Sequence, residues 1–438
     1  MTPRRSRWLG VSLLASAGVG LLDMASMVNP AGARADDTAL IMGYASASDP
    51  SQSYVNEVMS LFLNPTPAAF PGQPVFPDYS PLVVSTPEGS YQQALTTGVS
   101  DLDQAITQQL DENNNVVVFG YSESSSIATQ EMVNLDALPA DEQPNPADLQ
   151  FVLVEDLNNP NGGFIERFPF LATESFPATP ADSPYQTDIY NIEYSGSSDF
   201  PQYPLNILAD LNAAAGYTDL HPFLLPGYPT TFNTSELAGA VLEPTSPGYS
   251  GATEYFMIPT QNLPLLDLLR DVPGVGPAMA DLIQPDLRVL VDLGYNWTGY
   301  ADVDTPADAT MPSVDSTTVS AELAAGAQQG MIAAEVDLGM LPAADLPNAY
   351  PYLPDVAGLQ SGLLDTGVST SAASAETSGA LDISGVLAEL TAYLPGATSD
   401  LSALIGSSAT AELTSLLTAD LLPSLTTLFA NPLDLLSL

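Results

Sequence analysis

Short apolar runs alternate with amphipathic stretches over most of the central chain. Val116 to Phe119 are four apolar residues, three of them β-branched, between an asparagine turn and Gly120, which is typical of a buried parallel strand. From about Ser90 to Leu110, apolar side chains recur three and four positions apart, and this spacing predicts a long helix. We therefore expect an α/β domain with a mostly parallel sheet flanked by helices. The same patterns predict further strands at Ala39–Met42, Leu82–Val84, Phe151–Val154, Ile189–Tyr194 and Tyr255–Ile258, and further helices at Ser51–Phe62 and Ser124–Leu135.

The first 35 residues have the pattern of an export signal. Three arginines within the first seven residues precede the apolar run Trp8 to Leu22, and the small-residue sequence Ala33-Arg34-Ala35 follows. We expect cleavage before Asp36, so that residues 1–35 are a signal peptide and the protein is secreted or held in the cell envelope. The general secretory and twin-arginine routes both stay open. An uncleaved membrane anchor is the less favoured alternative, because the run has 15 residues rather than about 20 and Asp23 interrupts it.

Beyond about residue 305 the composition changes. Alanine, serine, threonine, leucine and acidic residues dominate, arginine is absent, and helical patterns at 319–340 and 383–438 are weak. We expect residues 36–305 to form the α/β domain and residues 306–438 to form a low-complexity acidic extension that is partly disordered. The alternative is that the leucine-rich end contacts envelope lipid or a partner, since residues 421–438 carry one acid, Asp434, and no cation.

The charge balance narrows the partners and the chemistry. Seven arginines and no lysine stand against 52 acids, so the net charge is −45, and an acidic surface repels nucleic acid. The chain has no cysteine, which excludes disulfides, thiolate catalysis and cysteine-ligated metals, and its single histidine excludes a multi-histidine metal centre. We expect no metal and no organic cofactor. Past the signal only Arg167, Arg270 and Arg288 remain, and they are expected to brace the structure through ion pairs or loop contacts.

The pentapeptide Gly120-Tyr121-Ser122-Glu123-Ser124 carries the best candidate nucleophile. It follows the predicted strand and precedes a predicted helix, which is the strand–turn–helix context of a nucleophile elbow with serine in place of the last glycine. The same spacing recurs at Gly367-Val368-Ser369-Thr370-Ser371, where no apolar strand precedes it. The context therefore favours Ser122 as the nucleophile. The alternative is an ordinary helix cap, a role for which the neighbouring serines also qualify.

A serine nucleophile needs a base, and His221 is the one histidine in the chain. It follows Ser122 in the order serine, acid, histidine that α/β-hydrolases use. The orienting acid is expected at the carboxyl end of a strand between the two. We select Asp199, which follows the predicted strand Ile189–Tyr194 through a short serine-rich loop, and Asp156 after the preceding strand is the competitor.

An oxyanion hole is expected from two backbone N–H groups. One belongs to Glu123, directly after the nucleophile, and the other to Tyr44 in the loop Gly43-Tyr44-Ala45 after the first strand. The small residues on either side of Tyr44 allow the backbone to approach a substrate closely.

These residues, taken with several other blocks, resemble the PE-PPE domain of mycobacteria, a serine α/β-hydrolase domain with a cutinase-like fold. The resemblance spans about Thr38 to Thr305 and implies hydrolysis or transfer of acyl esters by a Ser-Asp-His triad on Ser122, Asp199 and His221. One departure is Pro222, which follows the histidine where the family pattern has glycine. The matching blocks are the pentapeptide at 120–124, Asn158-Asn159-Pro160-Asn161-Gly162-Gly163 with Arg167, Asp199-Phe200-Pro201 with Pro204-Leu205-Asn206, Asn262-Leu263-Pro264-Leu265, Pro285-Asp286-Leu287-Arg288 and Asp292-Leu293-Gly294-Tyr295.

The expected function is that of an exported serine esterase or lipase-like hydrolase that cleaves acyl esters through an acyl-enzyme. An acyltransferase that moves acyl chains onto envelope glycolipids such as trehalose esters would use the same residues. A third possibility, from a different class, is a catalytically idle module that binds the envelope. The partner in the first two cases is an acyl ester or lipid, and the sequence leaves the acyl chain length, the acceptor and the oligomeric state open.

Overall fold

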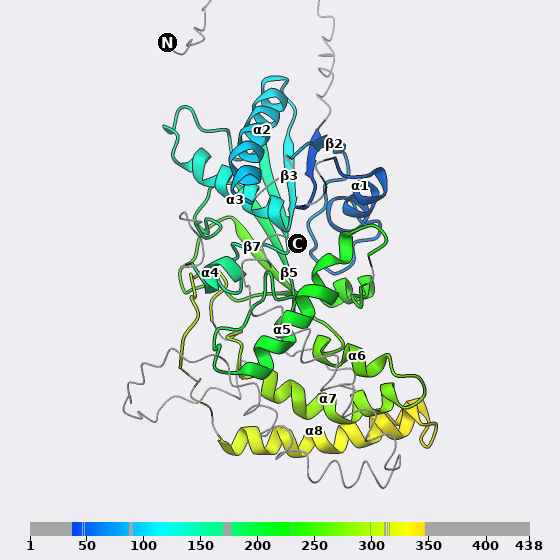
Figure 1. Cartoon of the computed structure of the whole chain (residues 1–438). Coiled ribbons are helices and arrows are strands. Elements are labelled where there is room, and N and C mark those ends of the chain that lie inside the picture. The colour runs from blue at the N-terminus through cyan, green and yellow to red at the C-terminus, as the bar shows by residue number, and fades with distance from the viewer. Residues whose placement is uncertain are drawn as a thin grey trace, which may run out of the picture. The chain divides into compact units, whose positions relative to one another are not determined.

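One mixed sheet organises the part of the chain that the computed structural model describes, residues 37–346 apart from 46, 48, 87–90, 170–176, 229, 298, 311, 313 and 315. Its strands are β1 (Thr38–Met42), β2 (Ser80–Val84), β3 (Val116–Tyr121), β4 (Leu149–Val154), β5 (Gln186–Ile192), β6 (Val241–Leu242) and β7 (Thr253–Ile258). They form a seven-stranded sheet in the order β2-β1-β3-β4-β5-β7-β6, in which every neighbouring pair is parallel except β6 and β7 (Figure 1). The predicted, mostly parallel sheet is confirmed.

Helices flank this sheet, and most lie where the periodicity predicts them. The predicted helix at Ser51–Phe62 is divided into α1 and a wider helical turn at Met59–Leu63. The predicted strand at Ile189–Tyr194 ends at Ile192, and Tyr194 already belongs to a turn. The helices are α1 (Gln52–Val58), α2 (Tyr91–Asp111), α3 (Glu123–Asp136), α4 (Phe164–Arg167), α5 (Ile207–Asp219), α6 (Asp267–Arg270), α7 (Gly276–Asp292) and α8 (Ser316–Asp337), with short helical turns at His221–Leu224, Thr234–Gly239, Pro264–Leu266 and Ala343–Asp345.

Each face of the sheet has its own apolar core, because successive side chains of a strand point to opposite faces. Helices α2 and α3 cover one face, where Leu102 and Ile127 are fully buried (Figure 1). The opposite face is covered by α1, α7 and the turns at Met59–Leu63 and His221–Leu224, and there the rings of Phe62 and Phe119 lie 6.0 Å apart. Burying one such side chain contributes about 1.5–3 kcal/mol, so the two cores hold the helices on the sheet.

The strand order places a topological switch beside β1. This strand pairs with β2 on one side and with β3 on the other, so the chain continues from here toward both edges of the sheet. In open α/β sheets, ligands bind beyond the carboxyl ends of the strands at such a switch. The loop Gly43-Tyr44-Ala45 follows β1, and Ser122 follows β3. Both segments therefore lie at the edge of the sheet where ligands bind in such folds.

Helix α8 lies beyond residue 305 and packs against α7 (Figure 1). Glycine makes the approach close, since a Cβ on Gly326 would lie 2.4 Å from Asp286 Oδ1 and one on Gly330 would lie 2.1 Å from the carbonyl oxygen of Leu282. This helix overlaps the helical pattern at 319–340 within the predicted extension. The predicted signal peptide at 1–35 and the weak helical pattern at 383–438 lie outside the described residues. No helix among those described is long and apolar enough to cross a membrane.

Two of the three arginines beyond residue 35, Arg167 and Arg288, are buried and brace the loops at the carboxyl ends of the strands, as expected. Arg288 of α7 donates to Glu193 Oε2 at 2.9 Å and to the carbonyl oxygen of Thr260 at 2.8 Å, which ties the helix to the ends of β5 and β7. Arg167 of α4 donates to the carbonyl oxygen of Phe200 at 3.0 Å. Arg270 pairs with Asp281, between α6 and α7.

Several buried carboxyl groups hold protons more tightly than they would in water. Burial raises the pKa of Asp210 and of Glu243 to about 8, and that of Asp188 to about 7, because the charged form loses its hydration. The folded state therefore binds more protons than the unfolded state between about pH 4 and 8. The stability that this provides is fully present below the unfolded pKa values and is lost as the pH rises through 7 to 8.

We predict a higher melting temperature at pH 5.5 than at pH 8.5, by roughly 4 to 8 °C, which corresponds to about 2 kcal/mol. Asp210→Asn removes one titrating group and reduces the difference, whereas Asp141→Asn at an exposed site leaves it unchanged. Scanning fluorimetry across the pH range measures this. A melting temperature that rises toward pH 8.5 contradicts the prediction.

Candidate active site

Ser122 occupies a strained turn between β3 and α3. Its backbone has φ 59° and ψ −123°, in the positive-φ region that costs a non-glycine residue about 1–3 kcal/mol. Gly120 has no room for a side chain, because a Cβ there would lie 2.6 Å from the carbonyl oxygen of Ser124. Ser124 Oγ accepts from the backbone N–H of Tyr121 at 2.8 Å and closes the turn. The elbow predicted from the pentapeptide is therefore present in the backbone.

The register of the sheet brings a second residue to the level of Ser122. Tyr121 at the end of β3 is paired with Val154 at the end of β4, so Ser122 and Glu155 are the first residues beyond two neighbouring strands. Glu155 also has a positive φ, of 54°. Two strained residues thus leave adjacent strands at the same edge, and both side chains meet the same histidine.

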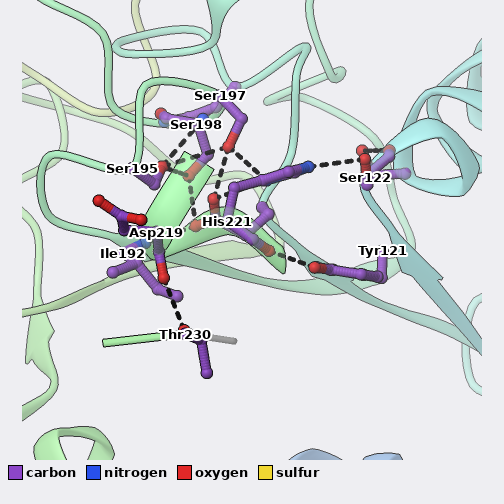
Figure 2. A network of polar contacts seen from close by, with 12 residues as sticks. Tyr121, Ser122, Ile192, Ser195, Ser197, Ser198, Asp219, His221 and Thr230 are labelled. Carbon is purple, nitrogen blue, oxygen red and sulfur yellow. Dashed lines mark hydrogen bonds and ion pairs between the residues drawn. The ribbon is translucent and has the colours of Figure 1, made fainter. Parts of the chain in front are cut away.

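His221 begins a helical turn directly after α5 and contacts the nucleophile. Its Nε2 lies 2.9 Å from Ser122 Oγ, and its side chain is 9% exposed. Figure 2 shows the imidazole reaching toward Ser122, with Ser195, Ser197 and Ser198 gathered on the other side of the ring. For Ser122 to donate to Nε2, the proton of the neutral imidazole must be on Nδ1. The question is then which acceptor takes that proton.

The carboxylate beside Nδ1 is Glu155. Its Oε2 lies 3.1 Å from His221 Nδ1, and Ser197 Oγ lies 2.7 Å from the same nitrogen. Glu155 is fully buried, and Oε1 accepts from the backbone N–H of Ile192 and from Ser198 Oγ, both at 2.8 Å. The Ser197 hydroxyl donates to Oε2. These donors fix both oxygens, so the carboxylate can hold the imidazole in one tautomer and one orientation.

Asp199 does not contact His221, in contrast to the sequence-based expectation. Its Oδ2 accepts from the backbone N–H of Tyr194 at 2.9 Å and its Oδ1 from Trp297 Nε1 at 3.3 Å. From the serine-rich loop, Ser197 Oγ contacts His221 Nδ1 and Ser198 Oγ donates to Glu155. Burial raises the pKa of Asp199 to about 7, although both hydrogen bonds oppose this shift. In the structure Asp199 accepts both bonds within its own region, and Glu155 is the carboxylate that lies beside His221 Nδ1.

The competitor, Asp156, also lies away from the imidazole. Its carboxylate accepts from Thr179 Oγ1 at 2.6 Å and from the backbone N–H of Asn158 at 3.1 Å. Burial raises its pKa to about 6. One feature of the sequence points to Glu155: it is the first residue after the predicted strand Phe151–Val154, whereas Asp156 is the second.

The two residues expected to form the oxyanion hole lie at this edge of the sheet. Glu123 is the first residue of α3, so its backbone N–H is one of the free donors at the helix N-terminus. Its side chain is buried, and burial raises its pKa to about 7. The ring of Tyr44 lies 6.2 Å from that of Tyr121, which places the loop after β1 beside the elbow. The backbone N–H of Glu123 thus directly follows the nucleophile, and Tyr44 contacts the residue before the nucleophile through its ring.

Together these groups form a serine hydroxyl, an imidazole and a buried carboxylate in a continuous hydrogen-bonded chain. Such a series of hydrogen bonds raises the nucleophilicity of the serine. When the serine attacks a carbonyl carbon, its proton passes to the imidazole. Within the described part of the chain, no three histidine, cysteine or acidic side chains lie together in an arrangement that fits a metal ion.

The family model described as the PE-PPE domain matches residues 65–296 of the chain. PE family protein PE3 of Mycobacterium tuberculosis is 48% identical over 295 residues, which cover 64% of this chain and 61% of the relative. Esterase PE16 of the same organism is 39% identical over 294 residues, which cover 66% of this chain and 54% of the relative. This chain thus spans 61% and 54% of the lengths of these two relatives.

A more distant relative is named for a different activity. Diacyltrehalose acyltransferase Chp2 of Mycobacterium tuberculosis is 29% identical over 273 residues, which cover 56% of this chain and 69% of the relative. No solved structure gives a significant match to the chain.

We predict that Glu155→Gln slows the labelling of Ser122 by a fluorophosphonate probe by at least about 100-fold, because the amide no longer accepts the Nδ1 proton and the imidazole is held in the wrong tautomer. In Asp199→Asn, the rate of labelling stays within about threefold of the parent rate once it is corrected for the folded fraction. Mass spectrometry of the labelled peptide identifies the serine, and the melting temperature reports folding. Equal losses in the two variants would contradict the assignment of Glu155.

Proposed function

We propose that this chain, which belongs to the PE-PPE domain family, hydrolyses acyl esters through a covalent intermediate on Ser122. The observation that carries the proposal is the hydrogen-bonded chain from Ser122 through His221 to Glu155. The similarity to Esterase PE16 over 294 residues supports an acyl ester as the substrate. The acid differs from the one that the resemblance implies, since the geometry favours Glu155 over Asp199.

In the first half of the proposed reaction, Ser122 Oγ attacks the ester carbonyl carbon and His221 Nε2 takes the serine proton. Glu155 accepts the hydrogen bond from Nδ1 and stabilises the imidazolium. The carbonyl oxygen becomes an oxyanion, which the backbone N–H groups of Glu123 and Tyr44 stabilise. The bond to the alcohol then breaks, His221 Nε2 gives its proton to the departing oxygen, and an acyl-enzyme remains.

In the second half, a hydroxyl group attacks the acyl-enzyme. His221 takes the proton of the attacking group, and the ester bond to Ser122 breaks with return of that proton to Oγ. Water as the attacking group gives hydrolysis. A sugar or lipid alcohol gives acyl transfer, the second candidate function, which the similarity to Diacyltrehalose acyltransferase Chp2 favours. In acyl transfer, the molecules that receive the acyl group would be envelope glycolipids such as trehalose esters.

The place of action that we propose is outside the cytoplasm. The arginines, apolar run and small-residue site in the first 35 residues support export and cleavage before Asp36. In this arrangement the catalytic domain begins at residue 36. For the extension at residues 306–438, contact of its leucine-rich end with envelope lipid stays the alternative to a partly disordered tail.

We predict hydrolysis of p-nitrophenyl esters by the purified protein, with kcat reduced by about 10⁴-fold or more in Ser122→Ala and in His221→Ala. Ser369→Ala is the matched control, because Ser369 has the same G-x-S-x-S spacing but follows no predicted strand, and this variant is expected to keep the parent activity. A series of acyl chain lengths places the enzyme between esterase and lipase. A parent that cleaves none of the esters contradicts the proposal and favours an idle envelope-binding module. Full activity in Ser122→Ala contradicts it in another way, because it rules out Ser122 as the nucleophile.

The same assay with trehalose added separates hydrolysis from transfer. If water is the acceptor, free acid equals released p-nitrophenol at every trehalose concentration. If the sugar is the acceptor, free acid falls below p-nitrophenol and acyl-trehalose appears in the mass spectrum. The second result would replace the hydrolase proposal by the transferase one.

A further inference from the structure

The imidazole of His221 stacks with two tyrosine rings. The ring centroid of Tyr217 lies 5.0 Å from that of His221 with 10° between the planes, and the centroid of Tyr121 lies 5.6 Å away with 26° between the planes. One face of an imidazole accommodates one ring at these separations and angles. We therefore place the two tyrosines, called the tyrosine pair below, on opposite faces of the base.

The tyrosine pair connects the elements that carry the nucleophile and the base. Tyr121 is the last residue of β3, directly before Ser122, and its hydroxyl donates to the carbonyl oxygen of His221. Figure 2 shows this contact beside the elbow. Tyr217 lies in the last turn of α5, four residues before His221, so the two side chains share one side of the chain as it leaves the helix. Each ring is thus fixed by an element that positions a reacting group.

Ionisable groups from three elements face the imidazole. The ionisable groups that face it are Glu155 from the end of β4, Tyr121 from β3 and Tyr217 from α5, while Asp219 precedes it by two residues at the end of α5. Burial raises the pKa of both tyrosines, so both rings are neutral phenols when the enzyme works. Neutral electron-rich faces attract a cation held over them.

We propose that Tyr217, with Tyr121, is a positioning residue for the base: it holds the imidazole plane so that Nε2 points at Ser122, and it stabilises the imidazolium that forms when the proton moves. This rests on the proposed function, because it assigns Tyr217 a part in the same proton transfer. The effect is specific to the protonated state of His221. A cation–π contact stabilises the imidazolium by about 0.5–2 kcal/mol, and it stabilises the neutral imidazole far less. A tyrosine that only packed against the imidazole would stabilise its charged and neutral states equally.

The test compares Tyr217→Leu with Tyr217→Phe, which restores the ring without the hydroxyl. In Tyr217→Leu we expect kcat to fall about 3- to 30-fold with KM within about twofold, and the acidic limb of the kcat profile to move to lower pH by about 0.5 to 1 unit, because the protonated base has lost stabilisation. Tyr217→Phe brings both readouts back to within about threefold and 0.2 unit of the parent. Tyr300→Leu, at an exposed tyrosine, is the control. An unmoved acidic limb in Tyr217→Leu overturns the proposal.

A second series keeps the shape of the ring and so does not depend on the folding of the leucine variant. Phenylalanine, 4-fluoro-, 3,5-difluoro- and pentafluorophenylalanine are introduced at position 217, and kcat is expected to fall stepwise as fluorine withdraws charge from the ring face. A flat series overturns the proposal. Fluorophosphonate labelling of Ser122 in the parent distinguishes the two levels: labelling with a flat series rejects the role of Tyr217 alone, whereas a parent that neither labels nor cleaves esters rejects the proposed function.

Discussion

The hydrogen bond between Glu155 and His221 Nδ1 is the contact on which the candidate site depends. A carboxylate that loses its hydration is costly unless other groups satisfy it. This protein has few cations for the purpose, because arginine is scarce and lysine is absent. The described contacts to Glu155 come instead from two serine hydroxyls, one backbone N–H and the imidazole. The serine-rich loop after β5 therefore supplies the donors that a cation supplies elsewhere, and in doing so it sets the position of the histidine.

Much of the fold was predictable from local patterns, because buried parallel strands appear as continuous apolar runs and covering helices have a regular apolar spacing. The nucleophile was predictable for the same reason: its turn depends on Gly120, Ser122 and Ser124, which are neighbours in sequence. His221 followed from being the one histidine. Each of these inferences uses information within a few residues or a count over the whole chain.

The acid was not predictable in this way. Glu155, Asp156 and Asp199 all follow predicted strands, and all three are buried. Which of them faces the imidazole depends on the register of β3 against β4 and on the path of the loop from Ser195 to Ser198, and neither is encoded in a local pattern. The packing of α8 against α7 was missed for a similar reason, since glycine contacts between helices leave no apolar periodicity.

The single histidine permits a direct measurement of the central contact. With ¹⁵N-histidine labelling, every imidazole signal in the NMR spectrum belongs to His221. We expect a strongly downfield proton coupled to Nδ1 in the parent protein, unchanged in Asp199→Asn and lost or shifted far upfield in Glu155→Gln. A downfield Nδ1 proton that survives in Glu155→Gln and disappears in Asp199→Asn would contradict the assignment of Glu155 as the partner of the base.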